Sequence, residues 1–302
     1  MAKHRAVPLL VVLVLVWALS WPVIKLGVSS TPPLWYAACR YTLAAPLMFA
    51  YVLLRGQLRF PPRADWPMVL ASGALQMAAY SALTSIALTM LPPGRAAVLA
   101  FSTPIWVVPL AAWRLREFPS RREALGIALG LAGACAIAMP SLEMGRLDQL
   151  LACGMLIVAA GAWAVAIVCV RAHRFAATSL QLSPWQTLLA ASVLLLAAAC
   201  FEGRPPPISQ QVIGSLLYVG PVATAFAYWA ILEASRHLPP STISMSLLAV
   251  PLLGMLISAV MFHESAGSSL VCGMLLIGAG MFLAIGAGSR IPDRREQVPQ
   301  RN

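Results

Sequence analysis

One charged side chain, Arg40, lies inside a long apolar stretch of the sequence, between the apolar residues of 33–39 and 41–54. An arginine held at the centre of a bilayer costs about 2.5–3.5 kcal/mol on insertion scales, so such a residue faces the protein interior or a hydrated cavity. Its guanidinium could pair with the carboxylate of a bound molecule. Alternatively, it could bond carbonyls at a helix end near a membrane surface, and the sequence leaves both possibilities open.

Aromatic and hydrogen-bonding residues recur at helical spacing in other apolar stretches. Gln76 and Tyr80 are four residues apart, as are Thr224 and Tyr228, and residues at this spacing share a helix face. Such polar stripes should point away from lipid, into a pocket with aromatic walls and a few hydrogen-bonding groups. The alternative is that they hold helices together or, for tryptophan, form an interfacial belt. The candidate substrate-binding residues are Trp17, Arg40, Gln76, Tyr80, Trp163, Thr224, Tyr228 and Trp229.

Patterns typical of catalysis or metal binding do not occur in the sequence. The four histidines have no paired spacing, and the six cysteines include no CxxC pair. No glycine-rich phosphate loop or nucleophile motif is present. The sequence therefore predicts no enzyme, no catalytic residue, no metal and no cofactor.

The elements that must position the candidate residues follow from composition. Of 302 residues 60% are hydrophobic and only 10% charged, whereas a soluble domain has about 45–50% apolar and about 25% charged residues. Charges leave nine apolar windows of 18 to 29 residues, and a tenth spans about 33–54 around Arg40. About 20 apolar residues cross a bilayer as a helix. The sequence predicts an all-α polytopic membrane protein with ten transmembrane helices.

The net charge of +11 is distributed in a way that orients these helices. If the first helix enters from the cytoplasm, sixteen of the 21 Lys and Arg residues fall on the cytoplasmic side, four on the outside, and Arg40 within the membrane. This asymmetry follows the positive-inside rule. We expect both termini in the cytoplasm, attraction to anionic lipid, and no nucleic-acid partner. The first stretch is interpreted as a retained helix, because no clear cleavage site follows it.

An internal repeat divides the chain. At an offset of 147 residues, Leu91-Pro92-Pro93 recurs as Leu238-Pro239-Pro240, Glu117 matches Glu264, and Gly126 and Gly133 match Gly273 and Gly280. We expect two five-helix units, 1–145 and 146–290, followed by a disordered tail, 291–302. Because five is odd, the second unit is inverted relative to the first, an arrangement typical of alternating-access transporters.

Proline occupies equivalent positions in the two units. Pro104 and Pro251, also 147 residues apart, should fall mid-helix, where proline removes a backbone hydrogen bond and permits a kink. We predict that they act as hinges, although proline is common in membrane helices generally. Glycines in the fifth and tenth helices suit close packing within the chain.

Several of these residues resemble a known family. The pattern Trp17-x-x-Ser20-x-Pro22-x-x-Lys25-x-Gly27, then Pro32-Pro33 and Arg40, resembles the first two helices of EamA-domain proteins of the drug/metabolite transporter superfamily. The segments at Glu117 and Glu264 resemble the end of each EamA repeat. The resemblance spans about residues 8–287 and implies ten helices around a central cavity, and efflux of amino acids, metabolites or drugs.

The resulting hypothesis is a secondary transporter of the inner or plasma membrane that works by alternating access and exports small amphipathic metabolites such as amino acids. The alternative is a membrane-embedded interaction or assembly protein without transport activity. Its partners would be a small-molecule substrate and the lipid bilayer. The sequence leaves substrate, direction, coupling ion and oligomeric state open, and a monomer is consistent with it.

Overall fold

The computed structural model describes residues 3–116, 120–207, 209–238, 240–247, 249–263 and 267–287, and every regular element within them is helical. Glu117, Glu264 and Pro239 of the repeat, and the tail 291–302, lie outside the described residues.

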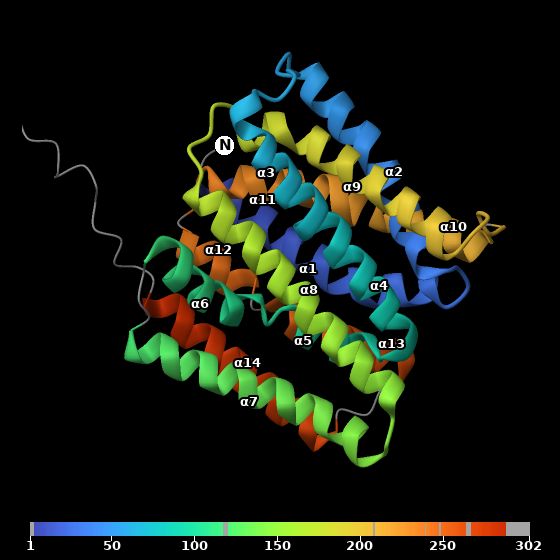
Figure 1. Cartoon of the computed structure of the whole chain (residues 1–302), viewed down its shortest axis with the longest axis vertical. Helices are drawn as coiled ribbons and strands as arrows, with labels where there is room; N and C mark the ends of the chain where they lie inside the picture. The colour runs from blue at the N-terminus through green and yellow to red at the C-terminus, as the bar shows by residue number, and fades with distance from the viewer. Residues whose placement is uncertain are drawn as a thin grey trace, which may run out of the picture.

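The helices of the first half follow one another along the chain (Figure 1). They are α1 (Lys3–Val28), α2 (Pro33–Leu54), the 3-10 helix η1 (Arg63–Asp65), α3 (Trp66–Leu70), the π-helix η2 (Ala71–Ala79), α4 (Tyr80–Met90), α5 (Pro93–Ala100), α6 (Thr103–Leu115) and α7 (Arg121–Glu143).

The second half has a similar order of elements. They are α8 (Leu147–Ala172), α9 (Ser179–Phe201), α10 (Gln210–Val219), the π-helix η3 (Pro221–Phe226), α11 (Ala227–Ser235), α12 (Pro240–Leu247), α13 (Ala249–Phe262) and α14 (Ser268–Ala287).

Eight helical segments of the described chain are long and apolar enough to cross a membrane, and Ala249–Phe262 and Ser268–Leu283 are shorter apolar helices. Several spans are composites: Arg63–Met90 joins η1, α3, η2 and α4, and Gln210–Ser235 joins α10, η3 and α11. The chain therefore folds as an all-helical polytopic membrane protein.

The pair α7 and α14 packs closely along its length (Figure 1). A Cβ on Gly133 would lie 2.6 Å from the carbonyl oxygen of Gly273, and one on Gly280 would lie directly against that of Gly126. Only glycine allows two backbones this close, and small residues drive helix packing in lipid. The prediction that glycines of these two helices pack within the chain is confirmed for Gly126, Gly130, Gly273 and Gly280, whereas a Cβ on Gly278 would meet nothing within 4 Å.

A second antiparallel pair, α2 and α9, lies at the junction of the two halves. Gly73 of η2 contacts the Gln186 carbonyl of α9, where a Cβ would be 2.9 Å from the oxygen. Gly220, just before η3, also lies close to α2, where a Cβ would be 3.1 Å from the carbonyl oxygen of Arg40. The span Arg63–Met90 thus packs against α9 of the second half, and the span Gln210–Ser235 packs against α2 of the first half.

The span that contains Pro104 is broken just before that residue. Helix α5 ends at Ala100, Phe101 and Ser102 form a turn, and Pro104 lies in the first turn of α6. Proline is favoured there because its missing N–H would be unpaired anyway. Pro251 is likewise the third residue of α13. The prediction of a mid-helix proline is therefore corrected for Pro104, which begins the second part of an interrupted span; the residue before α13, Leu248, lies outside the described residues.

Candidate functional site

Arg40 is joined to the second half of the chain by its side chain. Its Nε donates a 2.6 Å hydrogen bond to Oγ1 of Thr224, and the Thr224 hydroxyl donates to the carbonyl of Val219 at 2.8 Å. The guanidinium carbon lies 5.4 Å from the ring centroid of Tyr41. Because the bond goes to a side chain on η3, Arg40 lies in the interior between α2 and the span Gln210–Ser235.

Trp17 reaches the same π-helix from α1. Its indole Nε1 donates to the carbonyl of Ala223 at 3.1 Å, next to Thr224. A π-helix leaves backbone groups in non-standard positions and is frequent at functional sites. Trp17, Arg40 and Thr224 therefore meet around η3.

Tyr80 and Trp163 form a second contact between the halves. Their ring centroids are 4.6 Å apart at 89°, an edge-to-face arrangement that aromatic pairs prefer. Gln76 lies partly buried on η2, one turn before Tyr80.

The two π-helices end at equivalent positions of the two halves. Helix η2 ends directly before Tyr80 and η3 ends directly before Ala227, and these two residues are 147 residues apart.

Tyr228 donates a 3.0 Å hydrogen bond to Oε1 of Gln186, which is buried on α9. Gln186 stands 146 residues after Arg40, so the second half has an amide where the first has a guanidinium. Sequence reasoning missed Gln186, although the repeat offset locates it.

Trp229 lies apart from this group. Its ring contacts Phe226 and Tyr51 at centroid distances of 5.6 and 6.1 Å, and it packs against apolar residues of α1 such as Leu10. Its indole N–H is buried and has no hydrogen-bond partner.

Three charged residues, Lys25, Asp65 and Glu202, bind backbone at helix ends, and the sequence did not predict these bonds. The Lys25 ammonium donates to the carbonyls of Leu88 and Leu91 at 2.6 and 3.3 Å, where α4 ends. A cation stabilises the C-terminus of a helix through its unpaired carbonyls. Lys25 therefore bonds the last carbonyls of α4.

The carboxylates of Asp65 and Glu202 bind opposite ends of the α2–α9 pair. Glu202, at the end of α9, accepts the N–H groups of Leu34 and Trp35 at 3.0 and 2.9 Å, at the start of α2. Asp65 accepts from the N–H groups of Ala176 and Ala177 on the approach to α9, the shortest of these bonds being 2.7 Å. Carboxylates at helix starts satisfy N–H groups that have no partner in the helix.

His173 adds a 2.8 Å hydrogen bond to Asp65, whose side chain is fully buried. The only sequence signal for these two carboxylates was that each is an isolated acid in a loop next to arginines.

Apolar helices that bury a few polar side chains between two halves define a polytopic membrane protein with an internal polar site. The sequence profile of the EamA-like transporter family matches residues 4–139 and again residues 150–286. The chain belongs to the EamA-like transporter family, within the drug/metabolite transporter superfamily.

Individual relatives span nearly the whole chain. It is 25% identical over 272 residues to the "Uncharacterized transporter YoaV" of Bacillus subtilis, covering 89% of this chain and 92% of that protein. It is 27% identical over 296 residues to a "Probable amino-acid metabolite efflux pump" of Salmonella typhimurium, covering 92% and 93%. A solved structure with 22% identity aligns with a TM-score of 0.62 over 96% of this chain and all of the other, and shows the same fold.

Proposed function

We propose that this protein is a secondary transporter that exports small amphipathic metabolites, such as amino acids, by alternating access. The observation that carries the proposal is the hydrogen bond between Arg40 and Thr224, which places a cationic group on the contact between the two halves. Relatives named as amino-acid metabolite efflux pumps support this substrate class.

The transport cycle requires two halves that exchange conformations, and we infer that 1–145 and 146–290 are inverted five-helix repeats with ten spans in total. Support comes from reciprocal contacts. Gly73 packs against Gln186, and its counterpart Gly220 packs against Arg40. Gly133 packs against Gly273, and its counterpart Gly280 packs against Gly126. Each pair maps onto its counterpart at an offset of 146 or 147 residues, which a two-fold axis in the membrane plane would produce.

The substrate site lies near the bilayer midplane between these halves. Arg40 would bind a carboxylate through the guanidinium N–H groups that Thr224 does not accept, since arginine has five donors. The edge-to-face pair of Tyr80 and Trp163 would hold the apolar part, with Gln76, Tyr228 and Trp17 near it. Pro104 and Pro251 would be hinges, since Pro104 follows a break in its span and Pro251 occupies the equivalent position in the second unit.

Orientation is set by the distribution of basic residues, with both termini in the cytoplasm. Reporter fusions after residues 60, 145 and 302 should report inside, outside and inside. Two disagreements among the three would overturn this topology.

Transport is tested by counterflow in proteoliposomes with a labelled amino-acid panel. We expect accelerated exchange of at least one amino acid over protein-free liposomes and over an Arg40→Ala variant that inserts equally. Equal rates for all members of the panel in all three preparations would contradict amino-acid export.

A further inference from the structure

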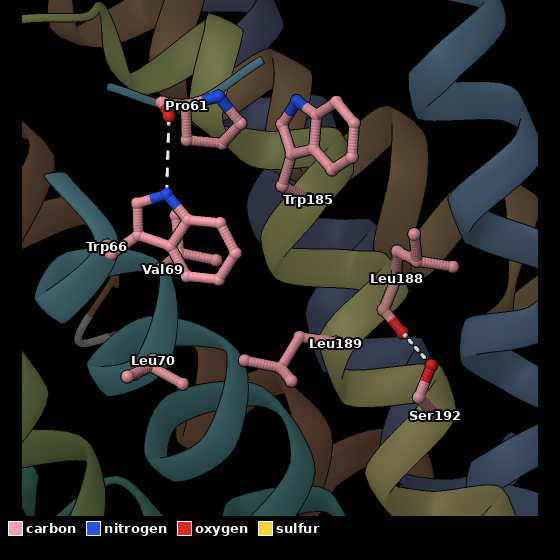
Figure 2. Close-up of a pocket in the computed structure, with 8 residues that line it drawn as sticks. All are labelled: Pro61, Trp66, Val69, Leu70, Trp185, Leu188, Leu189 and Ser192. Carbon is pink, nitrogen blue, oxygen red and sulfur yellow. Dashed lines mark hydrogen bonds between the residues drawn. The ribbon is translucent and has the colours of Figure 1, made fainter. Parts of the chain in front are cut away.

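An apolar groove of about 220 Å³ opens between the start of the third span and α9, away from the polar site (Figure 2). Trp66, Val69 and Leu70 form one wall, and Trp185, Leu188 and Leu189 form the other. The two helices are in direct contact beside the groove, where a Cβ on Gly73 would lie 2.9 Å from the Leu189 side chain and from the Gln186 carbonyl oxygen.

The polar atoms of the groove are already used. Trp66 donates from Nε1 to the Pro61 carbonyl at 3.3 Å, and Trp185 donates to the Arg59 carbonyl at 3.0 Å. The Ser192 hydroxyl donates to the Leu188 carbonyl of its own helix at 2.9 Å. Both indole N–H groups therefore bond the loop at one end of the groove, and what is left is apolar surface that suits a hydrocarbon chain.

The loop at this end carries free positive charge. Arg59 and Arg63 flank Pro61, are exposed, and form no ion pair with any residue that the structure describes. Phe60, 65% exposed, lies against both indoles with centroid distances of 4.9 Å to Trp185 and 5.7 Å to Trp66. Exposed aromatic rings beside arginines are typical of the level of lipid headgroups.

We propose that this groove is a binding site for an anionic glycerophospholipid of the cytoplasmic leaflet. One acyl chain lies between the third span and α9, and the phosphate pairs with Arg59 and Arg63. Basic residues next to a membrane attract anionic headgroups. The leaflet rests on the orientation given under the proposed function, but binding itself does not depend on transport.

A second apolar groove, of about 370 Å³ between α4 and α8, provides an internal comparison. Leu147 and Leu151 line it, and the basic residue beside it, Arg146, forms a 3.4 Å ion pair with Asp148. A neighbouring carboxylate weakens the attraction of that site for an anion, so the second groove should accept acyl chains without preference for headgroup charge.

The test uses the purified full chain and phosphatidylglycerol that carries a diazirine in one acyl chain, with phosphatidylcholine of the same chains for comparison. We expect cross-linked peptides from phosphatidylglycerol to be enriched several-fold over phosphatidylcholine at residues 61–70 and 185–192, and equal for both lipids at residues 147–158. Equal labelling of residues 61–70 and 185–192 by the two lipids would overturn the proposal.

Native mass spectrometry measures the headgroup contribution. The double variant Arg59→Gln and Arg63→Gln should bind phosphatidylglycerol about tenfold more weakly, while the double variant Arg114→Gln and Arg116→Gln, at the end of α6 and away from the groove, should bind as the original chain does. These four arginines are exposed, so folding is preserved, which equal melting temperatures would verify. Unchanged affinity in the first variant would also overturn the proposal. Neither readout involves transport, so either can fail while the proposed function stands.

Discussion

Arg40 on α2 and Thr224 on η3 are joined by a hydrogen bond of 2.6 Å, although 184 residues separate them in the chain. The threonine hydroxyl donates its own hydrogen bond to the Val219 carbonyl, so its oxygen is oriented as an acceptor for Arg40. The guanidinium is thereby held between the halves, and among the described residues its hydrogen bond goes from Nε to Thr224 alone.

The first prediction concerns this pair. Arg40→Ala should lower transport of a carboxylate substrate at least tenfold, because a hydrogen bond to a charged group contributes about 1.5–3 kcal/mol. Thr224→Val keeps the charge and removes the acceptor, and it should lower transport less. Uptake per reconstituted molecule measures both, and wild-type rates for Arg40→Ala would remove Arg40 from the site.

The two tyrosines should differ in which part of the side chain matters. Tyr80 contacts Trp163 through its ring, so Tyr80→Phe should transport nearly normally and Tyr80→Ala should be impaired about tenfold or more. Tyr228 donates to Gln186 through its hydroxyl, so Tyr228→Phe should already be impaired severalfold. Lipid-facing controls are Leu131→Ala on α7 and Leu275→Ala on α14. If both alanine variants match the controls, the site lies elsewhere.

Close packing of α7 and α14 can be tested with two glycines on one helix. Gly280→Val would place side-chain atoms against the Gly126 carbonyl and should lower the melting temperature by several degrees. Gly278→Val is the matched control, since a Cβ there meets nothing within 4 Å. Thermal melting in detergent measures both, and equal temperatures would contradict the role assigned to the pair.

The two carboxylates that bind helix starts should matter for stability more than a surface acid does. Asp65→Asn leaves N–H groups of Ala176 and Ala177 with a weaker acceptor in a buried site, and we expect a loss of roughly 1–3 kcal/mol in the free energy of unfolding. Glu202→Gln should lose less, because Glu202 is partly exposed.

Asp148→Asn is the control for both. Both side chains of its ion pair with Arg146 are about half exposed, and such pairs contribute little to stability. Denaturant unfolding in micelles would compare the three. A loss for Asp148→Asn as large as that for Asp65→Asn would contradict the special role of the buried carboxylate.

Apolar window lengths predicted the membrane fold because lipid forces backbone groups into helices. The pairing of Trp17, Arg40 and Thr224 was anticipated only as membership of a common site, since polar stripes indicate which face is buried but not which helix it meets. The roles of Lys25, Asp65 and Glu202 could not be predicted, because binding to backbone groups depends on tertiary neighbours and has no residue-type signature in the sequence.

The break before Pro104 was missed for a related reason. Proline is compatible both with a kink inside a helix and with the first turn of a new one, and the sequence around Pro104 does not separate these outcomes. Only the turn at Phe101 and Ser102 does so, where Ser102 accepts the N–H of Ile105 and α6 begins.

The last prediction tests whether this break is a hinge. Pro104→Ala restores an N–H in the first turn of α6 and allows the α-helix to continue backward through Ser102, which would stiffen the span. We expect substrate affinity within about twofold of wild type but a transport rate several-fold lower, because the rate of a cycle depends on the conformational step that a hinge allows. Pro109→Ala is the matched control, since Pro109 lies inside α6 on an exposed face. Binding measured in detergent and exchange measured in proteoliposomes separate the two effects, and a wild-type exchange rate for Pro104→Ala would show that the break is not a hinge.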